Sequence, residues 1–102
     1  MLVDTGPLVA SFNEADRWHT VCVKTLSSMH DPLMTTWPTI TEAMYLLDAS
    51  VKAQDGLWDF LLSGALIVLP VDVEDIARMR ELMHQYHNRH IDFADAALVR
   101  VA

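Results

Sequence analysis

Three short, apolar-rich runs constrain the fold of this chain more than any other feature. They cover residues 1–4, 33–36 and 66–71, and none shows a regular alternation of apolar and polar residues. A strand with one exposed face shows that alternation, whereas a strand covered on both faces does not. The three runs therefore predict strands of a parallel sheet that is covered on both faces.

Apolar residues at helical spacing fill the intervals between these runs. The stripes lie at residues 18–29, 40–47, 57–61 and 76–86, and a last helix is expected from Asp92 towards Ala102. The second stripe begins just after Trp37-Pro38, and Gly64 ends the third. The intervals 5–32 and 38–65 are each long enough for two helices. Strands followed by helices predict an α/β fold, and 102 residues suit one domain, residues 1–102.

The charge balance bears on which partners the chain can bind. Its 14 acidic residues against 7 Lys and Arg give a formal charge of -7. That balance disfavours a broad nucleic-acid surface, because phosphates require Lys and Arg. It permits acids gathered at one point to hold a cation. No apolar run is long enough to cross a membrane, the amino terminus lacks a basic region, and Cys22 is the single cysteine. These features predict a cytoplasmic protein with no membrane partner.

Four acids stand at positions where a helix is expected to begin. Asp4 follows the first strand, Glu42 opens the helix after the second, and Asp92 and Asp95 open the last helix. Helix capping explains each one singly: Asp4 or Thr5 as a cap, Thr39-x-x-Glu42 as a capping box, and Asp92 as an N-cap. Asp95 would favour the positive end of the helix dipole.

Taken together, the acids allow a second interpretation. The carboxyl ends of parallel strands meet at one edge of the sheet, where ligands bind in open α/β folds. Asp4, Glu42 and Asp95 would all lie at that edge, and their charges would repel unless a cation held them. Carboxylates without His or Cys partners select hard cations. The sequence therefore predicts a Mg²⁺ or Mn²⁺ site there.

Three segments carry a resemblance to a known family, and they occur in its order and spacing. They are residues 4–8 (DTGPL), 37–43 (WPTITEA) and 90–99 (HIDFADAALV). The chain resembles PIN domains of the toxin (VapC) type, metal-dependent ribonucleases of toxin–antitoxin pairs. The resemblance implies a three-layer α/β/α fold with a small parallel sheet. Family members continue into further strands with another acid, and this sequence, which ends at Ala102, lacks them; it is expected to be a C-terminally truncated form.

The resemblance also implies roles for particular residues. Asp4, Glu42 and Asp95 would be catalytic and, with Asp92, would hold Mg²⁺ or Mn²⁺. The ion would make a bound water nucleophilic towards an RNA phosphodiester. Thr5 would position a phosphate or a water. Arg17 and Arg89, with Arg78 and Arg80, are the available phosphate contacts, so a homodimer could complete RNA recognition. A cognate antitoxin protein is the implied partner.

Two alternatives remain open at this point. The chain could be a catalytically inactive or truncated PIN-domain protein that acts only through protein–protein binding. It could also be a phosphotransferase that uses Asp4 as its nucleophile. That chemistry usually places a second acid two residues after the first, and position 6 is Gly. The phosphotransferase therefore ranks last.

Overall fold

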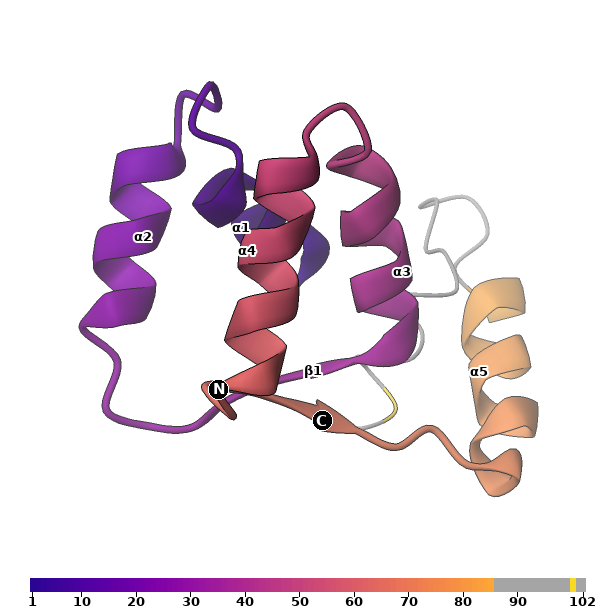
Figure 1. Cartoon of the computed structure of the whole chain (residues 1–102). Helices are drawn as coiled ribbons and strands as arrows, with labels where there is room; N and C mark the ends of the chain where they lie inside the picture. Colours follow the sequence, from indigo (N-terminus) through magenta and orange to yellow (C-terminus); the bar gives the residue numbers. More distant parts are fainter. Residues whose placement is uncertain (86–99, 101–102) are drawn as a thin grey trace.

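The computed structural model describes residues 1–85 and residue 100 (Figure 1). In that part of the chain five helices and two strands follow one another in the order of an α/β domain. They are α1 (Thr5–Phe12), α2 (His19–Ser27), β1 (Leu33–Thr36), α3 (Trp37–Leu46), α4 (Val51–Leu62), β2 (Leu66–Leu69) and α5 (Val73–Gln85). Two intervals of the sequence were each predicted to contain two helices, and both predictions are confirmed. The first interval contains α1 and α2, and the second contains α3 and α4. The expected helix from Asp92 lies outside the described residues.

The sheet is parallel, as predicted, and β1 lies at its centre. β1 pairs with β2 in a register that runs from Leu33 opposite Leu66 to Thr36 opposite Leu69. On the other side of β1, Leu2 forms a parallel bridge to Met34. β1 has the predicted bounds, whereas β2 ends two residues early, at Leu69. Pro70 follows, and proline has no backbone N–H to continue the ladder.

The predicted first strand, residues 1–4, is reduced to that single bridge. Val3 N donates to the Met34 carbonyl and Met34 N donates to the Met1 carbonyl, both at 2.8 Å. Beyond this point the Val3 carbonyl accepts a hydrogen bond from the buried Thr35 hydroxyl at 2.9 Å. The next residue, Asp4, already caps α1. A side-chain hydroxyl and an early helix start therefore end the strand before it becomes regular.

Local capping sets the ends of α4. The Ser50 hydroxyl accepts a hydrogen bond from Ala53 N at 3.1 Å, the usual arrangement at a helix start. After the helix, Gly64 adopts a φ of 80°, which side chains with a Cβ rarely reach. The turn into β2 thus depends on this glycine, which the sequence marked as the end of the helix.

The main core lies between the strands and helices α1, α3 and α4. Its buried members include Val3, Leu8, Leu33, Ile40 and Leu57. In Figure 1, α1 to α4 stand on one side of the strands, and α5 stands beside α3. Met79 and Leu82 of α5 are buried in a separate small cluster. Among the described residues no helix is long and apolar enough to cross a membrane.

Leu57→Ala tests the core, since the Leu57 side chain is fully buried. Loss of a buried leucine side chain is expected to lower the free energy of unfolding by about 2–5 kcal/mol. Leu62, on the same helix, is 84% exposed, so Leu62→Ala is expected to change it by less than about 0.5 kcal/mol. Urea unfolding of both variants measures the difference. Equal losses would contradict the assigned core.

Candidate metal and catalytic site

Asp4 lies where the first apolar run turns into a helix. It is the N-cap of α1, and its Oδ1 accepts a hydrogen bond from Thr5 N at 2.7 Å. The capping role expected for Asp4 is therefore confirmed. The Asp4 side chain is exposed, and its second carboxylate oxygen has no hydrogen bond or ion pair within the described part of the chain. Asp4 can therefore cap α1 through Oδ1 and still offer its other oxygen to a cation.

Glu42 lies one turn inside α3, and its carboxylate faces α1. Its Oε2 accepts a hydrogen bond from the Thr5 hydroxyl at 2.9 Å, between residues 37 positions apart. Glu42 is half-buried and Thr5 is buried, so the contact is partly shielded from water. Among the described residues, Oε1 of Glu42 has no hydrogen-bond partner.

The capping box proposed for Thr39 and Glu42 is wrong. The helix begins at Trp37, with Thr36 at the N-cap and Pro38 in the first turn. Thr39 is therefore inside the helix, and its buried hydroxyl pairs with that of Thr36 at 3.1 Å. Glu42 is too far along the helix to reach back to the cap, and it bonds to Thr5 instead. This leaves Glu42 without a structural explanation in its own helix.

Thr5 thus links the two acids. Its backbone N–H holds Asp4, and its side-chain hydroxyl holds Glu42. The sequence suggested that Thr5 contacts a phosphate or water, and the structure gives its hydroxyl a protein partner. Signals local to one segment could not reveal this contact, because α1 and α3 meet only in the folded chain.

The donor set fits a hard divalent cation. Both groups are carboxylates, and no Lys, Arg or His forms an ion pair with either one in the described residues. Within the described part of the chain, each carboxylate keeps one oxygen without a hydrogen bond. The pair is not a complete site: within residues 1–85 and 100, no group of three or more His, Cys, Asp or Glu could hold a metal ion. Asp92 and Asp95, the other predicted ligands, lie outside the described residues.

The predicted phosphate contacts are not all near these acids. Arg17 follows the C-terminal end of α1, whereas Asp4 caps the N-terminal end of the same helix. The Arg17 guanidinium stacks 4.7 Å from the centre of the Trp18 ring. The structure therefore does not bring Arg17 to the acid pair. Arg89 lies outside the described residues.

Comparison with known proteins places this arrangement in a family. The sequence pattern of the PIN domain matches residues 1–102. The chain belongs to the PIN-domain family. This match confirms the resemblance that was drawn from the three motifs. The predicted α/β fold with a small parallel sheet is also confirmed.

A toxin of known structure shares the fold. The crystal structure of VapC20 of Mycobacterium tuberculosis, described as a toxin that cleaves the sarcin-ricin loop, matches with a TM-score of 0.87. The two sequences are 24% identical, and the match covers 98% of this chain and 78% of VapC20. At this identity the likeness concerns the fold. None of the curated proteins matches this PIN domain in sequence.

Proposed function

We propose that this PIN domain is a metal-dependent endoribonuclease, the toxin of a toxin–antitoxin pair. The observation that carries the proposal is the pairing of Asp4 and Glu42 through Thr5. Membership of the PIN family and the fold shared with VapC20 support it. RNA is the proposed substrate, a cognate antitoxin protein the proposed inhibitor, and the cytoplasm the proposed compartment.

In this proposal Asp4, Glu42 and Asp95 are catalytic and, with Asp92, hold Mg²⁺ or Mn²⁺. The bound cation supplies an activated water and neutralises charge that develops on the scissile phosphate. Asp4 and Glu42 present one oxygen each, and Thr5 keeps both carboxylates in place. A rigid pair of ligands lowers the cost of organising the site when substrate binds. Arg17 and Arg89 are retained as proposed RNA contacts, with a homodimer bringing Arg17 of a second copy to the RNA.

The test is cleavage of an end-labelled RNA hairpin by the purified protein in Mg²⁺. We expect internal cleavage of the RNA and none of the DNA with the same sequence. Asp4→Asn, purified in the same way, is the control for contaminating nuclease. No cleavage by the wild-type protein in either Mg²⁺ or Mn²⁺ would contradict the proposal. That result would favour the alternative, an inactive PIN protein that acts by protein–protein binding.

A further inference from the structure

A cleft of about 910 Å³ opens between the start of α3 and the helix α5. Figure 1 shows these two helices as neighbours at one end of the molecule. The α3 wall contains an aromatic side chain, and the α5 wall is apolar apart from Arg80 and His84. The main lining residues are Trp37, Pro38, Thr41, Ile76, Met79 and Arg80.

Trp37 supplies the largest flat surface in this cleft. It is the first residue of α3, and its side chain is 55% exposed. Its carbonyl accepts a hydrogen bond from the Thr41 hydroxyl at 3.0 Å, and Pro38 follows it, so its backbone is held in the first helical turn. An exposed indole on a backbone held in this way is a platform on which an unstacked nucleobase can stack.

Arg80 lies on the opposite wall, and it forms no ion pair with any of the described residues. Four of the six Lys and Arg in the described residues already have partners: Lys52 with Glu14, Arg78 with Glu81, Arg100 with Asp75, and Arg17 with the Trp18 ring.

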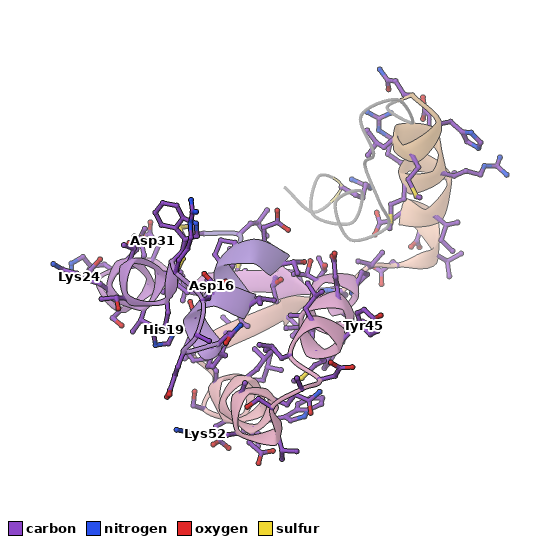
Figure 2. The ribbon with its side chains drawn as sticks, turned by 90° about the horizontal axis from the view of Figure 1, so that it is seen from above. Asp16, His19, Lys24, Asp31, Tyr45 and Lys52 are labelled. Carbon is purple, nitrogen blue, oxygen red and sulfur yellow. The ribbon has the colours of Figure 1, made fainter. Side chains whose placement is uncertain are left out.

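The two that remain are Lys24 and Arg80. Lys24 belongs to α2, at the opposite end of the molecule from α5 (Figures 1 and 2). Among the described Lys and Arg residues, Arg80 is therefore the one that lines this cleft without an ion-pair partner. The acid that lines the cleft, Asp72, lies before the start of α5 and forms no ion pair with Arg80 in the described residues.

The cleft reaches the stretch of α3 that carries Glu42. Thr41, which lines it, is the residue before Glu42. Pro38, also in the lining, is four residues before Glu42 and so lies on the same side of α3, about one turn away. A nucleotide seated on Trp37 would therefore be next to the phosphate that reaches the acids.

We propose that this cleft binds one unstacked base of single-stranded RNA on the Trp37 ring, with Arg80 contacting its phosphate. The inference rests on the proposed ribonuclease function. A purely apolar partner seated here would bury Arg80 without an anion, which is costly. A nucleotide supplies both the flat apolar ring and the anion that these two walls require.

Trp37 fluorescence reports on this contact directly. The variant Trp18→Phe/Trp58→Phe keeps Trp37 as the single tryptophan, and both replaced side chains are about half exposed. It is titrated with octauridylate and octaadenylate in EDTA, so that binding is measured without cleavage. We expect quenching by RNA. The matched variant Trp37→Phe/Trp58→Phe, which keeps Trp18, is expected to show none.

Substitutions separate the two walls. Trp37→Ala is expected to weaken binding of a labelled octanucleotide about tenfold, and Trp37→Phe to weaken it much less. Arg80→Gln should lower the slope of log affinity against log salt by about 0.7, the value for one phosphate on a single strand. Arg78→Gln, an exposed residue two positions earlier on α5 that is already paired with Glu81, should leave that slope unchanged.

The same preparations are assayed for cleavage in Mg²⁺, which separates the two proposals. RNA cleavage without Trp37 quenching would overturn the cleft assignment and leave the ribonuclease proposal intact. Trp37 quenching without RNA cleavage would support the cleft assignment and contradict the ribonuclease proposal. A Trp37 signal that changes with protein concentration alone would place a second copy in the cleft and would also overturn the assignment.

Discussion

Removal of divalent cations with EDTA is expected to abolish RNA cleavage by this PIN domain, and Mg²⁺ or Mn²⁺ is expected to restore it. The reason lies in the donor set, because Asp4 and Glu42 offer only oxygen atoms and have no cationic side chain between them in the described residues. Oxygen donors select hard cations. The measurement is the rate of RNA cleavage in EDTA, followed by addition of each metal in excess.

The control for this experiment is a measurement that the protein stays folded in EDTA. The core around Leu8, Ile40 and Leu57 is apolar and does not include either acid. The circular dichroism spectrum is therefore expected to stay the same in EDTA. Ca²⁺, which prefers longer bonds and more ligands, should restore the least activity. Undiminished cleavage in EDTA would show that these carboxylates do not act through a metal.

Glu42→Gln is expected to lower kcat/KM for RNA by more than about 100-fold. Loss of a residue that merely orients a metal ligand typically costs 10- to 100-fold, and loss of the ligand's charge should cost more. The substitution keeps the size of the side chain and its acceptor for the Thr5 hydroxyl, so the fold is retained. Steady-state kinetics on one labelled RNA gives the ratio.

Thr5→Val is the companion variant, because it removes the hydroxyl that holds Glu42 while it keeps the buried shape. It is expected to lower kcat/KM about 10- to 100-fold, and Thr5→Ser only slightly. If Thr5 acts through Glu42, the double variant should be no worse than Glu42→Gln alone. Additive losses would instead assign Thr5 a separate role, such as a direct contact to RNA.

The sequence predicted the sheet well where burial decides the structure. β1 has the predicted bounds, since it is central and covered. The first strand was overestimated because its end depends on the Thr35 hydroxyl, a contact 32 residues away that no local pattern encodes. Burial at the sheet is thus readable from the sequence, whereas side-chain bonds that interrupt a strand are not.

The proximity of Asp4 and Glu42 was predictable from the order of the strands in the sequence. Asp4 and Glu42 each follow an apolar run, and parallel strands bring such positions to one edge. The error at Glu42 came from reading Thr39 as the helix start. Pro38 gives the correct signal, because proline favours the first turn of a helix. Trp37 begins the second motif, but the sequence suggested no role for it, because the cleft that it lines forms only where α5 lies across from α3.

The central claim is that Asp4 and Glu42 hold one cation together. Calorimetric titration with Mn²⁺ tests it most directly, on the wild-type protein, Glu42→Gln and the exposed-acid control Asp48→Asn. Saturable binding by the wild type and Asp48→Asn, with loss of binding in Glu42→Gln, is the predicted result. Equal Mn²⁺ binding by all three proteins, or none by the wild type, would contradict the claim.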